Sequence, residues 1–460
     1  MSAFPEARRI ARLAWPLAIG QFGIMGMGVT DVIVAGNAGT ADLAAVTIGY
    51  YVWDLGMLLV LGIVLANGAL VGHRYGAGDI AGIRRQFQQC MWLSLPLALV
   101  SGAAIVGAIL AIPRLGLEPR VTRIAIGYLT PTVLTAMLVP VSISFRTTAE
   151  GVGLARPVMW LTLAAFLFNI PLDYALVAGR WGFPRMGGAG CGWATLVSIG
   201  GLLVAWLVYS LRAPVFGAYR LWSGFARPCW REFRATLELG LPIGLSLLAV
   251  GGFFAVVPLL MTALGTTAIA GHAVAITFDS VMFTIPLGLG QAMSIRVAHE
   301  LGGGDPRAAR QVCRTGMVLV LGIAVLQAAV TVAARVRIAG LFTNDPAVQE
   351  LGAVLLVYVA AYRLFDSMQV GAGMTLRGYK DTRVASAIDI VAYWVFGMPL
   401  CYSLGLGSAW NVARGVEGFW LGMVIAIGVA AICIAARLAT TSARALREPV
   451  VAGSAAGAPR

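Results

Sequence analysis

Charged residues are scarce in this chain. Only 12% of its 460 residues are charged and 59% are hydrophobic, and the mean hydropathy is +0.85. Because a soluble domain carries about 25% charged residues, the composition excludes a soluble protein and predicts an integral membrane protein. The short alternating apolar segments of a membrane β-barrel are also missing. The apolar runs are long instead, so we expect an all-α protein whose spans are helical.

The motifs of several other protein classes are absent as well. The six cysteines are scattered without a CxxC pair, and we interpret them as buried thiols, not as disulfides or a structural metal site. No phosphate-binding loop, HExxH motif or nucleophile triad is present, so ATP is not expected to supply the energy, and neither an enzyme nor a cofactor is predicted. The N-terminus runs directly into a long span, so no cleavable signal is expected. The net charge of +13 comes from arginines spread between the apolar runs and does not indicate a nucleic-acid partner.

The apolar runs predict twelve membrane-spanning helices. Most of the 33 basic residues lie at the N-terminus, at the C-terminus and in every second loop between these runs. Because basic residues are retained on the cytoplasmic side, both termini are predicted to be cytoplasmic. The runs cover residues 11–36, 45–72, 90–113, 123–145, 157–178, 188–211, 236–264, 268–295, 315–338, 350–375, 384–405 and 416–436.

The chain contains an internal repeat. "GTADLAA" at 39–45 matches "GTTAIAG" at 265–271, and "HRYGAGD" at 73–79 matches "HELGGGD" at 299–305. Each half holds six spans, an even number, so the halves enter the membrane the same way round. Parallel repeats of this kind are a secondary-transporter design, with the site between the halves. The predicted parts are an N-terminal lobe (1–211), a cytoplasmic linker (212–235), a C-terminal lobe (236–440) and a cytoplasmic tail without fixed structure (441–460).

The histidines of this repeat occupy matching cytoplasmic ends of the two halves. They are His73 and His299, each followed by a glycine-rich turn. We interpret them as side chains that cap helices or bind backbone.

Several carboxylates lie inside the predicted spans, where a charge costs roughly 2.5–3.5 kcal/mol. The direction of the spans places Asp31, Asn169, Asp173 and Thr195 at similar depth in the outer half of the first lobe. Asn169 and Asp173 share a helix face, and Pro171 between them removes a backbone hydrogen bond and is expected to bend the helix. These oxygens suit Na⁺ or a transferred proton. A polar contact that joins two helices is the structural alternative. The acidic residues inside spans are Asp31, Asp54, Asp173, Asp279, Asp366 and Asp389.

The second half of the chain contains a different set of charged residues inside its spans. Arg363 precedes Asp366 by three residues, so the two can form an ion pair on one helix face. In that case the pair is structural. Otherwise Asp366 is a membrane-embedded anion that attracts a cationic substrate or exchanges ions.

At these residues the chain resembles the multidrug and toxic compound extrusion (MATE) family, in its bacterial NorM-like branch. The similar segments are "GVTDVIVAG", "FNIPLDY" followed by "GGAGCGWAT", "HELGGGD" and "FDSMQVGAGMTLRGYKDT", in the expected order. The resemblance implies two six-helix lobes in a V shape and alternating access. It also implies a monomer in the bacterial inner membrane that exports cationic or amphipathic compounds in exchange for H⁺ or Na⁺.

The resemblance also assigns site residues. It implies a first-lobe cation site at Asp31, Asn169, Asp173 and Thr195 and a second-lobe ion or substrate site at Asp366. Many NorM-like members carry a glutamate where this chain has Val250. Asp279 is a possible substitute for that glutamate, or it is structural. We therefore expect coupling through the first lobe, with H⁺ favoured over Na⁺.

Two other functions fit a protein of this kind. A lipid-linked oligosaccharide flippase of related architecture requires a large cationic cavity, whereas Arg363 is the one arginine placed within a span. A non-transporting membrane receptor or scaffold leaves the first-lobe oxygens without a purpose.

Overall fold

The computed structural model describes residues 3–407 and 412–447 and is all-helical. Within that part of the chain, twelve helical segments are long and apolar enough to cross a membrane, which confirms the predicted number. The elements are α1 (Ala3–Ala38), α2 (Thr40–Gly76), α3 (Ile80–Ala111), η1 (Ile112–Leu115), α4 (Pro119–Gly151), α5 (Ala155–Ala178), α6 (Ala189–Arg212), α7 (Pro214–Gly217), α8 (Trp230–Met261), η2 (Thr262–Leu264), α9 (Thr266–Gly302), α10 (Pro306–Phe342), α11 (Pro346–Gly378), α12 (Arg383–Ile390), the π-helical segment η3 (Val391–Gly397), α13 (Met398–Leu406) and α14 (Gly415–Arg444).

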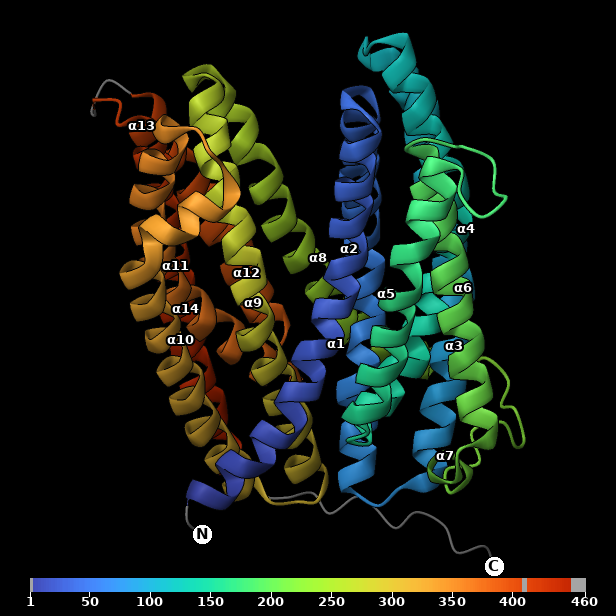
Figure 1. The fold of residues 1–460 in the computed structure, drawn as a ribbon. Coiled ribbons are helices and arrows are strands. Elements are labelled where there is room, and N and C mark those ends of the chain that lie inside the picture. The colour runs from blue at the N-terminus through green and yellow to red at the C-terminus, as the bar shows by residue number, and fades with distance from the viewer. Residues whose placement is uncertain (1–2, 408–411, 448–460) are drawn as a thin grey trace, which may run out of the picture.

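Two bundles stand side by side in Figure 1, α1–α6 in blue to green and α8–α14 in yellow-green to red. Within the first, α4 packs on α2, α3 and α6. Within the second, α11 packs in the corresponding way on α9, α10 and α14. The bundles approach each other in the lower part of the view and diverge upward. This arrangement confirms the predicted pair of six-helix lobes in a V.

The two ends of the molecule differ in how the lobes meet. We call the end where the chain begins and where α2, α4, α9 and α11 finish the proximal end, and the opposite end the distal end. The first turns of α1 contribute Ile10, Ala14 and Leu17 to an apolar cluster of the second lobe. Further along, α2 packs on α8 so closely that a Cβ added to Gly62 would lie 2.2 Å from the Gly244 Cα. Helix α2 therefore joins the lobes along a glycine-lined contact.

The repeated glycine-rich turns explain two helix starts. Gly78 and Gly304 have φ angles of 68° and 79°, in the left-handed region that favours glycine. The following Asp79 and Asp305 each accept a backbone N–H three residues on, at 2.7 and 2.8 Å, and so cap α3 and α10. The repeated motif is thus a helix-start signal in both lobes.

The histidines of the same repeat each contact the backbone of the opposite lobe. His73 Nε2 of α2 lies 2.8 Å from the carbonyl oxygen of Gly378, where α11 ends. His299 Nε2 of α9 lies 2.7 Å from the carbonyl oxygen of Gly151, where α4 ends. The expected binding of backbone by these histidines is confirmed, and the two contacts form a reciprocal pair at the proximal end.

Side chains on the outside of both lobes are apolar. Leu99, Leu110, Val318, Leu326 and Ile432 are each more than half exposed, which suits contact with lipid tails. Residues 214–217 of the predicted linker form α7, and α14 extends to Arg444. Positions 448–460 of the predicted tail lie outside the described residues.

Candidate functional site

The first-lobe site is built from three helices. Asp31 lies in the distal half of α1, Asp173 one turn before the distal end of α5, and Thr195 in the second turn of α6. Asp31 is 2% exposed and Asp173 is fully buried. The structure therefore brings together three of the four residues that the sequence placed at matching depth.

Two hydroxyl groups donate hydrogen bonds to Asp31. The Tyr128 hydroxyl on α4 lies 3.2 Å from Oδ2, and Thr195 Oγ1 lies 3.3 Å from the same oxygen. Because both donors are neutral, they orient the carboxylate without cancelling its charge.

Asp31 and Asp173 face each other. One carboxylate oxygen of each and the Cys191 thiol lie within 4.8 Å of one another. Neither carboxylate forms an ion pair within residues 3–407 and 412–447, and both Asp173 oxygens there lack a hydrogen-bond partner. Two buried like charges at this separation repel strongly, so the pair needs a proton or a small cation between its oxygens.

The fourth predicted residue, Asn169, is also buried. Its side-chain amide has no hydrogen-bond partner in the described part of the chain. It lies one turn before Asp173 on the same face of α5, so it can turn its oxygen toward a bound ion. Pro171 points outward between them and α5 continues through it, which leaves the Leu167 carbonyl without its usual helical donor.

The second-lobe residues form a buried triad. The Arg363 guanidinium binds Asp279 through Nε and Nη2 at 2.6 and 2.8 Å. The same Nη2 lies 2.9 Å from Asp366 Oδ2, so the expected Arg363–Asp366 pair is present and Asp279 joins it. Arg363 is 1% exposed. Both carboxyl groups contact the one guanidinium, so the triad has one net negative charge when both are ionised. Val250 packs in an apolar cluster with Phe253 and Phe254.

Two contacts of the first-lobe site were not foreseen from the sequence. Tyr128 carries no signal of its own, because it sits in an ordinary apolar stretch of α4. Cys191 falls inside the quoted "GGAGCGWAT" segment but was interpreted only as a buried thiol. Its nearness to the two carboxylates follows from the packing of α6 on α4 and α5, since α5 packs in turn on α1.

A small pocket opens at the distal end next to this pair. It has a volume of about 180 Å³, and its wall includes Val34 and Val177, one turn beyond Asp31 and Asp173 respectively. Asn37, Tyr174 and Arg185 lie around it. The carboxylate pair is therefore closer to the distal surface than to the proximal one.

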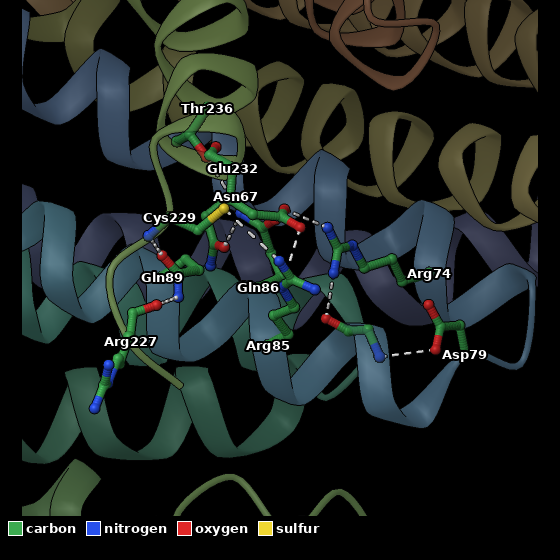
Figure 2. A network of polar contacts seen from close by, with 11 residues as sticks. Asn67, Arg74, Asp79, Arg85, Gln86, Gln89, Arg227, Cys229, Glu232 and Thr236 are labelled. Carbon is green, nitrogen blue, oxygen red and sulfur yellow. Dashed lines mark hydrogen bonds and ion pairs between the residues drawn. The ribbon is translucent and has the colours of Figure 1, made fainter. Parts of the chain in front are cut away.

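A polar network holds the lobes together at the proximal end (Figure 2). Glu232 in the first turn of α8 accepts from Arg74 of α2 at 2.7 Å and pairs with Arg85 of α3 at 3.3 Å. Gln86 of α3 donates to Asn67 at 3.2 Å and to Thr236 at 3.3 Å. The contacts of this network that reach α8, like the two histidine contacts, must break before the lobes can separate at this end.

Comparison with known proteins gives a consistent result. The family model described as MatE matches residues 16–175 and 242–403, once in each half of the chain. Multidrug resistance protein PmpM of Pseudomonas aeruginosa is 37% identical over 446 residues, covering 96% of this chain and 93% of that protein. Probable multidrug resistance protein NorM of Chromobacterium violaceum is 36% identical over 444 residues, covering 96% and 95%. These relatives confirm the NorM-like resemblance.

Solved structures share the fold. The eukaryotic MATE transporter AtDTX14 matches with a TM-score of 0.84 at 18% identity, covering 98% of this chain and 100% of that one. A multidrug resistance MATE transporter in an outward-facing conformation matches with a TM-score of 0.85 at 19% identity, covering 96% and 97%. With twelve apolar helices and bacterial relatives of this kind, the protein is a multi-pass inner-membrane protein and a transporter, not an enzyme. The chain belongs to the MATE family of multidrug efflux transporters.

Proposed function

We propose that this transporter is an antiporter that exports cationic or amphipathic organic compounds in exchange for H⁺. The observation that carries the proposal is the facing pair Asp31 and Asp173, buried in one lobe without an ion-pair partner among the described residues. The names of the relatives, which are multidrug resistance proteins, support a drug-like substrate. The protein acts as a monomer, with one pair per chain.

The orientation follows from the basic residues. The loops at the proximal end carry most of the arginines, so this end faces the cytoplasm and the distal pocket faces outward. In the arrangement described above, the proximal end is held closed by the histidine contacts and the Glu232 network. The carboxylate pair is then nearer to the outside, the side from which a proton would enter.

The exchange works through the charge of the pair. A proton that enters from the distal side bridges Asp31 and Asp173 and removes one negative charge from the lobe. A cationic substrate loses affinity when that charge disappears, so it leaves to the outside. The lobes then separate at the proximal end, and the proton is released to the cytoplasm. The coupling is the difference in affinity between the two states.

H⁺ fits the pair better than Na⁺ does. A shared proton needs only the two carboxylates, and the hydroxyls of Tyr128 and Thr195 already orient Asp31 for it. A sodium ion would require further oxygens, and the Asn169 amide could supply one only after turning toward the pair.

A flippase for a lipid-linked oligosaccharide is less well supported. Such a protein needs unpaired basic groups for a pyrophosphate, whereas the buried Arg363 is bound by two carboxylates. A receptor or scaffold role gives no reason for a buried carboxylate pair.

The test is transport of ethidium in proteoliposomes under imposed H⁺ or Na⁺ gradients. We expect an H⁺ gradient to drive transport in the wild type, and Asp31→Asn and Asp173→Asn to lose it while remaining folded. The matched control is Glu238→Gln, an exposed carboxylate of α8 paired with Arg234, which should transport normally. Transport by both asparagine variants at the wild-type rate would falsify the scheme, and a strict requirement for Na⁺ would replace H⁺ as the coupling ion.

A further inference from the structure

Asp389 on α12 is a buried carboxylate outside the sites described above. Its residue is 8% exposed. Gln369 Nε2 of α11 donates to Oδ1 at 2.6 Å, and the Ser246 hydroxyl of α8 makes a very short hydrogen bond to Oδ2. Among the described residues no ion pair includes Asp389. Three helices therefore converge on a carboxylate whose direct partners are all neutral.

The contacts extend into the next turn of the chain. Tyr393 donates from its hydroxyl to Gln369 Oε1 at 2.9 Å, which fixes the orientation of the amide. Tyr393 lies in η3, where the helix is π-helical, a widened form that is frequent at functional sites. Trp394 of the same segment donates to the Ala249 carbonyl at 2.9 Å and so holds η3 against α8.

These partners suit both charge states of the carboxyl group. A serine hydroxyl can donate to a carboxylate and can equally accept from a carboxylic acid. The Gln369 N–H can donate to a carboxylate oxygen or to the carbonyl oxygen of the acid. Both Asp389 oxygens therefore keep a hydrogen-bond partner when the group gains or loses a proton, so neither state incurs the cost of an unmade hydrogen bond at the carboxyl group.

The two other second-lobe carboxylates differ in this respect. Asp279 and Asp366 both lie against the Arg363 guanidinium, which can only donate and cannot lose its proton. Protonation of either would weaken a charge-assisted contact with that guanidinium, and protonation of Asp279 would break one of its two hydrogen bonds. Asp389 has no such partner, and a buried charge without an ion pair is costly, so its neutral form is accessible.

The surroundings of Asp389 contain few other charges. Arg377 on α11 lies within electrostatic reach, two turns from Gln369, but makes no ion pair with Asp389. Tyr393 on η3 is a titratable neighbour, and it lies within electrostatic reach of both Asp389 and Asp366. Helix α8 contributes the neutral Ser246, and α14 packs near α12 with apolar side chains such as Ile434 and Leu438.

We propose that Asp389, Ser246 and Gln369 form a reversible proton-binding site in the second lobe. A proton taken from water adds to Oδ2, and the Ser246 hydroxyl turns from donor to acceptor; loss of the proton reverses both changes. Asp389 lies six residues into the spanning segment that begins at Arg383, about 9 Å along the axis from the proximal end. The site thus lies in the proximal half of the second lobe, whereas Asp31 and Asp173 lie in the distal half of the first. It deepens the proposed function, because it gives the second lobe its own proton, but its existence does not require transport.

The test is infrared difference spectroscopy of the intact protein in liposomes, between acidic and alkaline buffer. Several carboxyl C=O bands, including that of the Asp31–Asp173 pair, should disappear at alkaline pH. We expect one of them to be missing in Asp389→Asn and shifted in Ser246→Ala. The matched controls are Asp305→Asn, an exposed cap of α10, and Ser280→Ala, whose hydroxyl bonds only its own helix. Both should keep the band in place.

The wild-type set of bands in Asp389→Asn, or an unshifted band in Ser246→Ala, overturns the proposal. Should Asp389→Asn fail to fold, Ser246→Ala decides the matter alone, since it keeps the carboxyl group. Failure of the antiport scheme is recognised separately, because it abolishes gradient-driven transport and leaves this band unchanged.

Discussion

Replacing Arg363 by methionine tests whether the second-lobe triad is structural. Arg363 is fully enclosed and binds Asp279 at 2.6 and 2.8 Å and Asp366 at 2.9 Å. Methionine fills a similar volume but leaves two adjacent buried carboxylates without a cation. Breaking a buried pair in this way costs about 3–5 kcal/mol. We therefore expect Arg363→Met to lower the free energy of unfolding by that amount and the melting temperature by several degrees.

A double-mutant cycle isolates the ion pair from the loss of packing. Asp279→Leu removes one of the two carboxylates, so in Arg363→Met/Asp279→Leu the remaining Asp366 can become neutral without facing another charge. We expect the double variant to be more stable than the sum of the single changes implies, with a coupling of about 1–3 kcal/mol. Melting is followed by tryptophan fluorescence in detergent micelles.

The control for this cycle is an exposed pair of the same kind. Arg234 and Glu238 lie 2.8 Å apart on α8 with most of the arginine in solvent. Arg234→Met should leave the melting temperature unchanged, because exposed ion pairs contribute little. Additive effects at Arg363 and Asp279, or an Arg363→Met protein as stable as the wild type, would refute the reasoning. The triad would then not stabilise the lobe.

Three further predictions concern the proximal contacts. The double variant His73→Ala/His299→Ala removes two interlobe hydrogen bonds of about 1 kcal/mol each, which should shift the equilibrium toward lobes separated at the proximal end roughly 30-fold. Spin-label distances between the lobes at that end should lengthen, and unchanged distances would contradict the prediction. Gly62→Ala places a Cβ 2.2 Å from the facing helix and should lower the melting temperature, whereas Gly107→Ala, with open space around it, should not. Glu232→Gln should lower the free energy of unfolding by less than about 1 kcal/mol, and by less still at high salt, since Arg74 also donates to the Gly82 carbonyl. A larger loss would contradict this expectation.

The repeated turn motifs illustrate what the sequence could predict. Asp79 and Asp305 cap α3 and α10 by accepting the backbone N–H three residues further on, and the glycines before them take left-handed φ angles. All of these contacts lie within one turn of chain. Local rules of this kind, together with apolar runs long enough to cross lipid, determined the twelve helices and the two repeats. The direction of each span then determined the depth of Asp31, Asp173 and Thr195.

Only the tertiary structure decided which side chains meet. Tyr128 bonds Asp31 across 97 residues of sequence, and Arg363 reaches Asp279 across 84. Ser246 and Asp389 are separated by 143 residues. Sequence periodicity specifies how deep a residue lies and which residues share its helix face, but not which neighbouring helix that face touches. That choice depends on how glycine-lined helices such as α2 and α8 pack, a property of the whole fold and not of any single segment.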